Sequence, residues 1–216
     1  MEKITEEESS QKSGFGGRKK KEIEEWLSKH RKEIESGKLV VLFVDECHLV
    51  WNDICGYIWG KTDIRIEVPM KNEKQRQTYY GALNSQTGKV IMKAYPQGNT
   101  ANTIKFIDSL KVEYPNTKLV IIWDGVPYHH SQEFREYLHQ VNSGEIEKEW
   151  MIKCIKLAPN APEQNPIEDV WLQGKNLVRK YWHLCKSFQV VKWLFEWAIC
   201  QDVFCFPKLS MYGLFS

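Results

Sequence analysis

The chain has 216 residues, of which 42% are hydrophobic and 27% are charged, and its formal net charge is +2. A chain of this length and composition can bury a sizeable core, which excludes a wholly disordered protein and predicts one soluble domain with extensions. No apolar run approaches the roughly 20 residues that a bilayer span needs, and the N-terminus lacks a signal-peptide pattern, so we expect a cytoplasmic protein with no membrane partner.

The N-terminal part predicts a flexible lead-in followed by a basic amphipathic helix. Residues 1–17 are rich in Glu, Ser and Gly, a composition typical of disorder. Residues 19–36 place apolar side chains at helical spacing on one face, and Gly37 is a suitable stop. The basic run at 18–21 permits contact with nucleic acid, although such a run is more often a solvated face.

Four strands are predicted after this helix. An apolar run indicates the first strand at 38–44, and the others are expected at 56–59, 78–84 and 90–95. The short polar loop between the last two contains Gly88 and is typical of a hairpin. We therefore expect an antiparallel meander in this part of the chain.

The second half of the chain alternates helices with strands. Thr100 or Asn102 is a suitable cap for the first of these helices, and Pro166 is a suitable start for the last. Alternating elements after a meander indicate an α/β fold with a mixed sheet. The aromatic tail at 190–216 is expected to pack on this core, with self-association as the alternative. The helices are predicted at 99–113, 131–141 and 166–182, and the strands at 118–123 and 151–157.

Three acidic residues in separate settings indicate a metal site. Asp45 and Asp124 each follow an apolar strand, and Glu168 follows a proline-rich stretch at 157–167. Together they offer the hard oxygen ligands that Mg²⁺ or Mn²⁺ prefers. Each alone is as readily a turn or helix-cap residue. Because independent caps have no reason to recur on two core strands and one helix, we interpret the three as one cluster suited to phosphoryl transfer.

Three sequence blocks surround these acids. They are Phe-Val-Asp-Glu at 43–46, Trp-Asp-Gly-Val-Pro-Tyr-His at 123–129, and Leu-Ala-Pro-Asn-Ala-Pro-Glu-Gln-Asn-Pro-Ile-Glu-Asp-Val-Trp at 157–171. The blocks resemble the signature blocks of DDE transposases in the IS630/Tc1/mariner superfamily, and the Asn-Pro-Ile-Glu segment is the most specific of them. The resemblance spans about 38–179. It departs at Gly125, where many members carry Asn after the second aspartate.

The resemblance implies an α/β RNase H-like fold, with a mixed five-stranded sheet flanked by helices. It also implies two divalent ions, Mg²⁺ or Mn²⁺, with Asp45 as the shared ligand and Asp124 and Glu168 each on one ion. Such a pair of ions supports in-line displacement at phosphorus. The implied enzyme cleaves DNA at insertion-sequence ends and transfers the strand to target DNA. A nuclease that only hydrolyses and an inactive DNA-binding remnant are the alternatives.

This interpretation divides the chain into three parts. Residues 1–37 are the flexible lead-in and basic amphipathic helix, 38–185 the RNase H-like DDE catalytic domain, and 186–216 an aromatic C-terminal extension packed on the core. The expected partners are double-stranded DNA, at transposon inverted repeats and at the target, and a second copy in a homodimer. Because 37 residues are too few for a compact helix-turn-helix module, the chain is expected to be either a fragment or the second reading frame of a split transposase. In the second case, a separately encoded helix-turn-helix protein is a further expected partner. In a prokaryotic host the protein would associate with the nucleoid.

Residues near the acids are candidates for DNA contact. Glu168, Trp171, Lys175 and Arg179 are three or four residues apart and share one helix face, so Lys175 and Arg179 are expected to contact phosphates; a solvated helix face is the alternative. The resemblance adds His129, near the active site, and a surface histidine is equally compatible with its position. Four neighbouring acids are rival metal ligands: Glu46, Asp53, Asp63 and Asp169. Alternation along the strand turns Glu46 away from the side that Asp45 faces.

Overall fold

The computed structural model describes residues 6–51, 63, 75–126, 131–142, 150–159, 162–200, 204, 206–210 and 212. The predicted strand at 56–59, the rival ligand Asp53 and the candidate His129 lie outside these residues. Within the described part of the chain, no helix is both long enough and apolar enough to cross a membrane.

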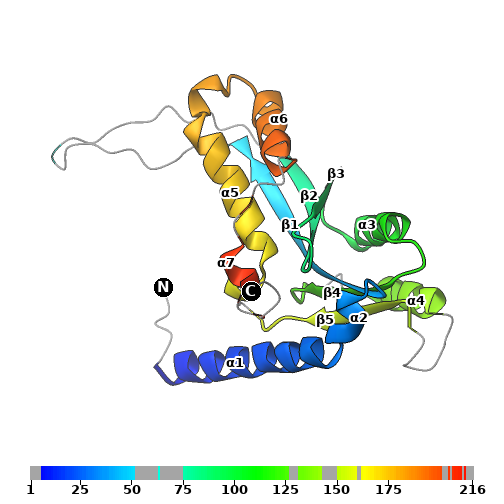
Figure 1. The fold of residues 1–216 in the computed structure, drawn as a ribbon. Helices are drawn as coiled ribbons and strands as arrows, with labels where there is room; N and C mark the ends of the chain where they lie inside the picture. Colours follow the sequence, from blue (N-terminus) through cyan, green and yellow to red (C-terminus); the bar gives the residue numbers. More distant parts are fainter. Residues whose placement is uncertain are drawn as a thin grey trace.

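The centre of the fold is one five-stranded sheet in the order β3-β2-β1-β4-β5 (Figure 1). β1 pairs with β2, and β2 with β3, in antiparallel fashion, while β1, β4 and β5 run parallel. The predicted mixed sheet of five strands is therefore confirmed. The strands are β1 (Leu39–Val50), β2 (Arg76–Asn84), β3 (Val90–Tyr95), β4 (Lys118–Trp123) and β5 (Ile152–Lys156).

The first strand is longer than its apolar run predicted. Its parallel pairing with β4 ends at Phe43, opposite Ile122, but its antiparallel pairing with β2 continues to Val50, opposite Arg76. In the second half of the strand, buried Cys47 and Leu49 alternate with more exposed residues, and β2 pairs with the backbone, so this half stays in the sheet without a continuous apolar run. Asp45 consequently lies within β1, just beyond the end of the β4 pairing, and not at a strand end.

Helices cover both faces of the sheet (Figure 1). On one face, α3 (Thr100–Glu113) and α4 (Gln132–Val141) pack in a core with the even-numbered β1 residues Leu42 and Val44. On the other face, α1, α5 and α6 pack in a core with the odd-numbered β1 residues Val41 and Phe43. This second face is the one that carries the site described below. Its helices are α1 (Glu6–Lys29), α2 (Arg31–Glu35), α5 (Ile167–Lys180), α6 (Phe188–Ile199) and α7 (Pro207–Ser210), with short 3-10 turns at Pro162–Gln164 and Trp182–Leu184.

Two helix starts differ from the sequence prediction. α3 is capped by Asn99, whose side chain accepts a hydrogen bond from the Asn102 backbone N–H at 2.8 Å, and not by Thr100 or Asn102. The first helix begins at Glu6, inside the segment expected as a lead-in, and it ends at Lys29 before α2.

The C-terminal aromatic residues divide between core and surface. Val191 and Phe195 on α6 are fully buried against α5, and Tyr212 joins the same core. Trp193 and Trp197 on α6 lie on the outer side, stacked with ring centroids 6.5 Å apart and exposed by 61% and 44%. α6 therefore covers α5 with one face and presents a tryptophan pair with the other.

Candidate active site

The two aspartates lie on the same face of the sheet. Phe43 on β1 pairs with Ile122 on β4, so Asp45 and Asp124, each two residues further on, occupy corresponding places at the end of the parallel pairing. Asp45 continues the alternation of Val41 and Phe43, and Asp124 that of Ile122, so both side chains lie on the face of the sheet that packs against α5. Glu46 follows the opposite alternation and interacts electrostatically with the Tyr80 hydroxyl, which packs under α3. The sequence prediction that Glu46 turns away from Asp45 is consistent with this arrangement.

Glu168 is fixed relative to these strands by the segment that precedes α5. The Asn165 side-chain amide donates to the Val44 carbonyl at 3.2 Å, directly before Asp45. Tyr212 donates its hydroxyl hydrogen to the Gln164 carbonyl at 2.7 Å. The Glu168 backbone N–H donates to the Asn165 carbonyl at 3.1 Å, which forms the first turn of the helix. The proline-rich stretch thus attaches the start of α5 to the middle of β1.

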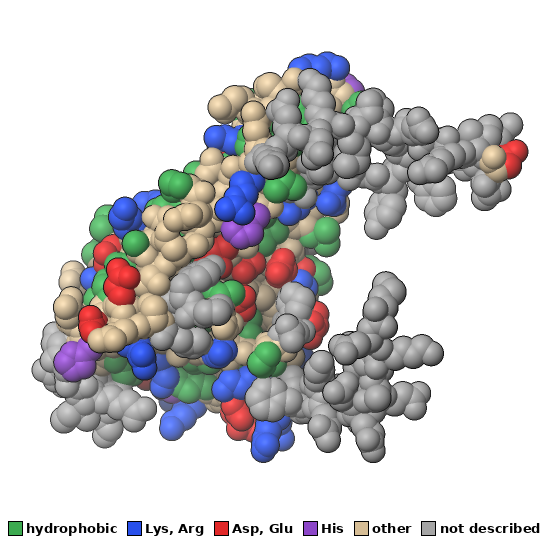
Figure 2. All heavy atoms as spheres, turned by 180° about the vertical axis from the view of Figure 1, so that it is seen from behind, with side chains coloured by type: hydrophobic (Ala, Val, Ile, Leu, Met, Phe, Trp, Pro, Cys, Tyr) green, Lys and Arg blue, Asp and Glu red, His purple; other side chains and the backbone are tan. Residues whose placement is uncertain are grey.

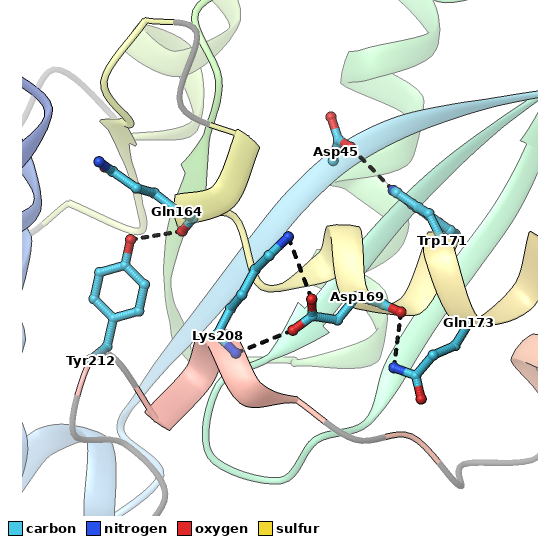
Figure 3. A network of polar contacts seen from close by, with 7 residues as sticks. All are labelled: Asp45, Gln164, Asp169, Trp171, Gln173, Lys208 and Tyr212. Carbon is cyan, nitrogen blue, oxygen red and sulfur yellow. Dashed lines mark hydrogen bonds and ion pairs between the residues drawn. The ribbon is translucent and has the colours of Figure 1, made fainter. Parts of the chain in front are cut away.

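Trp171 connects α5 directly to Asp45. Its indole N–H donates to Asp45 Oδ2 at 3.1 Å (Figure 3). The ring lies over Gly81, which pairs with Asp45 across the β1–β2 ladder, and a Cβ on Gly81 would overlap the ring and stand 2.9 Å from Ile167 Cδ1. Trp171 is 3% exposed, as expected for a core residue. Its hydrogen bond to Asp45 is a positioning role that the sequence pattern did not reveal.

The three predicted acids line one cavity of about 310 Å³. Each comes from a different element: β1, the loop after β4, and the first turn of α5. Acidic side chains gather near the middle of one face of the molecule, with Lys and Arg side chains on either side (Figure 2). The cavity is lined by Asp45, Asp124, Gly125, Val126, Lys156, Leu157, Ala158, Pro159, Asn165 and Glu168.

The carboxylates in this cavity destabilise one another's charge. Burial raises the pKa of Asp45 well above its ordinary value, and the nearby charges of Glu168, Glu46 and Asp124 add to the rise. Burial also raises the pKa of Glu168, while the charges of Lys208 and Lys175 oppose the rise. The cavity therefore favours a bound cation, because a cation removes the penalty of gathering these negative charges.

The donor set fits Mg²⁺ or Mn²⁺ chemically, although the carboxylates do not converge on one point. Among the residues that the structure describes, no three His, Cys, Asp or Glu side chains are grouped closely enough to hold a metal ion. Asn165 Oδ1, in the same cavity, is buried and has no hydrogen-bond partner within the described part of the chain. Three carboxylates and an orphaned amide oxygen are all hard oxygen donors, the kind these ions select.

The rival ligand on α5 is committed elsewhere. Asp169 is 6% exposed and forms an ion pair with Lys208 at 3.4 Å, and it also accepts the Lys208 backbone N–H at 3.2 Å (Figure 3). Its carboxylate thus attaches α7 to α5. Asp63, another rival, is exposed.

The two predicted phosphate contacts lie along α5, away from its buried side. Lys175 is close enough to Glu168 to lower the pKa of that carboxyl, and its amine donates to the His48 carbonyl on β1 at 3.4 Å. Arg179 lies one turn further and donates to Asn176 Oδ1 at 2.9 Å. Of these two residues, Lys175 is therefore the one next to the acidic cavity. His129 is outside the residues that the structure describes.

One cavity residue was missed in the sequence. Lys156 ends β5 and lines the cavity with the three acids. A Cβ on Gly125 would overlap the Cε and Nζ atoms of Lys156, so the side chain passes over the space that the glycine leaves. The only sequence signal for this contact was Gly125 itself, which departs from the resemblance at the position beside Asp124.

In fold, the chain is similar to solved structures of the mariner transposase Mos1. The Mos1 paired-end complex with Mg matches with a TM-score of 0.63 and 14% identity, over 98% of this chain and 62% of that chain. The Mos1 paired-end complex with the left transposon end matches with a TM-score of 0.58 and 14% identity, over 99% of this chain and 60% of that chain. The isolated Mos1 catalytic domain matches with a TM-score of 0.53 and 13% identity, over 99% of this chain and 89% of that chain. This chain therefore spans about 60% of the transposase chains in the end complexes, and the predicted RNase H-like fold is confirmed.

The sequence itself defines the family. No curated protein matches the chain. The profile of the DDE superfamily endonucleases matches residues 40–189, which run from the first residues of β1 to the start of α6 and include all three acids. The chain therefore belongs to the DDE superfamily of endonucleases.

Proposed function

We propose that this chain is the catalytic domain of a DDE transposase, which cleaves DNA at the ends of an insertion sequence and joins the freed 3′-hydroxyl to target DNA. One observation carries the proposal: Asp45, Asp124 and Glu168 line a single cavity, although they come from three elements far apart in sequence. Family membership and the likeness in fold to Mos1 support the same conclusion. The RNase H-like domain is assigned to 38–185, between the lead-in at 1–37 and the extension at 186–216.

The three carboxylates, Asp45, Asp124 and Glu168, are the residues that would hold two divalent ions. When bound, such ions lower the pKa of an attacking water or hydroxyl and neutralise charge at the phosphorus. The residues of the chain then have distinct tasks. Trp171 fixes the orientation of Asp45 through its hydrogen bond, and Asn165 holds the segment before Glu168 against β1. The hydrophobic core on the face of the sheet that carries the odd-numbered β1 residues excludes water from the apolar side of the cavity.

The proposed partners follow from this reaction. The substrate is double-stranded DNA, at transposon inverted repeats and at the target site, and the joining of two ends calls for a homodimer. The solved neighbours include a paired-end complex with a transposon end and a strand transfer complex. A helix-turn-helix module is assigned the recognition of the ends, either on a separately encoded protein or in a longer protein to which this chain belongs. Lys175, Arg179 and His129 are proposed DNA contacts, and the cytoplasm, at the nucleoid, is the proposed location.

Substitution of the acids tests the catalytic assignment. Asp45→Asn, Asp124→Asn and Glu168→Gln remove one ligand charge each with little change in volume, so each should lower the nicking of supercoiled plasmid in Mg²⁺ or Mn²⁺ by at least about a hundredfold. Lys105→Ala, on the exposed side of α3, is the control and should nick at the wild-type rate. Circular dichroism verifies that each variant is folded. A folded Asp45→Asn protein that still nicks at the wild-type rate would contradict the assignment.

A joining assay separates the transposase from a nuclease that only hydrolyses. A labelled duplex oligonucleotide with a free 3′-hydroxyl is incubated with plasmid, protein and Mn²⁺. Covalent transfer of the label to the plasmid is expected if the same site joins strands. Nicking without any transfer would favour the hydrolytic alternative.

A further inference from the structure

Lys156 occupies a fixed place at the rim of the acidic cavity. It ends β5 opposite Trp123, and the backbone N–H of the next residue, Leu157, donates to the Trp123 carbonyl at 2.8 Å. The backbone from which the lysine extends is therefore attached to the strand that leads to Asp124. Its side chain is exposed and lines the cavity. Among the described residues, its amine makes no ion pair or hydrogen bond.

Gly125 provides the space for this lysine. The glycines of positive φ in the described chain are Gly37 and Gly88, so the backbone at 125 does not itself require glycine. A Cβ at 125 would overlap the end of the Lys156 side chain. The absence of a side chain at 125 thus has a steric consequence: it lets the Lys156 amine lie over residue 125 without displacement.

Lys156 also lines two cavities. It lines the acidic cavity with the three carboxylates, and it lines a second cavity with Arg18, Lys19 and Glu22 of α1, where the Lys19 amine pairs with Glu22 at 2.9 Å. The Lys156 side chain therefore lies between the carboxylates and a part of the N-terminal helix on which the cations outnumber the acids. A DNA strand carries one negative charge per phosphate. A strand that enters the carboxylate cavity must pass over the edge of the cavity, where Lys156 lies.

We propose that the Lys156 amine binds a phosphate of the DNA strand being cut, next to the carboxylate cavity, and that Gly125 keeps the path of that amine open. This inference rests on the proposed function of the site. Lysine acts on phosphate as a compact point charge with rotatable donors, which suits a flexible side chain at an exposed rim. The contact offsets the repulsion between the strand and the carboxylates, so it contributes to binding and to the rate of cleavage.

Substitution of the lysine tests the phosphate contact. Lys156→Met keeps most of the side-chain length without the charge and should lower plasmid nicking about tenfold, whereas Lys156→Arg should restore most of it. In binding to a fluorescein-labelled 30-base-pair duplex, measured with EDTA present, Lys156→Met should reduce the slope of log K against log salt by about one phosphate contact. Lys105→Met is the matched control and should change neither measurement. Wild-type nicking and an unchanged slope in Lys156→Met would overturn the inference.

A double-mutant cycle tests the role of Gly125. Gly125→Ala should displace the amine and lower nicking by about the same factor as Lys156→Met, and the double variant should be no worse than either single variant. Two losses that multiply in the double variant would overturn the link between the residues. Failure of the site itself is distinguishable, because in that case the wild-type protein would nick no faster than Asp45→Asn.

Discussion

Asp45 combines three features that few surface aspartates share. It lies inside a strand, it accepts the indole hydrogen of a buried tryptophan, and three other carboxylates raise its pKa after burial has already done so. Burial and like charges both disfavour the charged form, and one hydrogen bond does not offset them. At neutral pH, a charged Asp45 therefore stores unfavourable free energy in the fold, which a bound cation would release.

This stored free energy predicts the effect of Asp45→Asn on stability. The folded protein binds the Asp45 proton more tightly than the unfolded chain, whose pKa is near 3.8. The contribution of Asp45 to stability is thus fully present below that pH and is lost as pH rises through the folded pKa. Each unit of elevation costs about 1.4 kcal/mol at high pH. Without added metal, Asp45→Asn should therefore raise Tm at pH 8 by several degrees and have little effect at pH 4.

Thermal unfolding across pH, followed by circular dichroism, checks this prediction. Asn keeps an oxygen that accepts from Trp171, so the hydrogen bond is retained. Asp63→Asn, at an exposed position, is the control and should shift Tm little at either pH. Addition of MgCl₂ should reduce the advantage of Asp45→Asn, because the cation stabilises the wild-type carboxylates. A Tm that falls at pH 8 in Asp45→Asn would contradict this account.

At the scale of elements, the sequence predicted best where hydrophobic periodicity and local turn chemistry agree. β3 and β4 have the predicted bounds, because each is an apolar run closed by loop residues. β1 extends beyond its prediction because its second half alternates buried Cys47 and Leu49 with more exposed residues while pairing with β2, and this alternation lies outside the continuous apolar run on which the prediction was based. The position of Glu168 was predictable only as part of a motif, since hydrogen bonds to Val44 and from Tyr212 attach that segment to distant parts of the chain.

The close packing of α5 on β2 gives a prediction for Gly81→Ala. The added Cβ would overlap the Trp171 ring and approach Ile167, and both of these side chains are buried. Overpacking of this kind costs typically about 1–3 kcal/mol, and it should move α5 with Glu168 away from Asp45. The urea midpoint should fall, and nicking should fall further than the loss of folded protein explains.

A second glycine provides the matched control for this substitution. Gly17 lies in α1, and a Cβ there would meet nothing within 4 Å. Gly17→Ala should therefore stabilise the protein slightly, because alanine is favoured over glycine in a helix by about 1 kcal/mol. Equal stability and equal nicking of Gly81→Ala and the wild type would show that α5 tolerates displacement from the sheet.

At the scale of the whole molecule, cations lie on two sides of one acidic cavity. Lys175 approaches Glu168 from α5, while Lys156 borders the cavity shared with Arg18 and Lys19 of α1. The sequence placed the basic run of α1 and the basic face of α5 in the chain, but not on opposite sides of a site. That arrangement depends on how β5 and α1 pack on the odd-numbered face, and this packing involves no local motif.

The cations on the two sides of the acidic cavity, which we call the α1 rim and the α5 rim, predict additive effects on DNA binding. Arg18→Ala with Lys19→Ala removes two cations from the α1 rim, and Lys175→Ala with Arg179→Ala removes two from α5. If a duplex crosses the cavity, each pair contacts different phosphates, so each double variant should reduce the salt slope by about 2 and the quadruple variant by about 4. The slope is measured by anisotropy with the 30-base-pair duplex in EDTA.

A double variant on the opposite face of the sheet controls for net charge. Lys93 on β3 pairs with Tyr80, whose ring packs under α3, and Lys105 is exposed on α3. Lys93→Ala with Lys105→Ala lowers the net charge as much as either rim variant, yet it should leave the slope near that of the wild type because these lysines lie away from the cavity. A slope that falls equally in all three double variants would mean that DNA responds to total charge, and the proposed path between the rims would be wrong. A fall confined to the α5 variant would instead place the duplex along that helix alone and would leave α1 outside the binding surface.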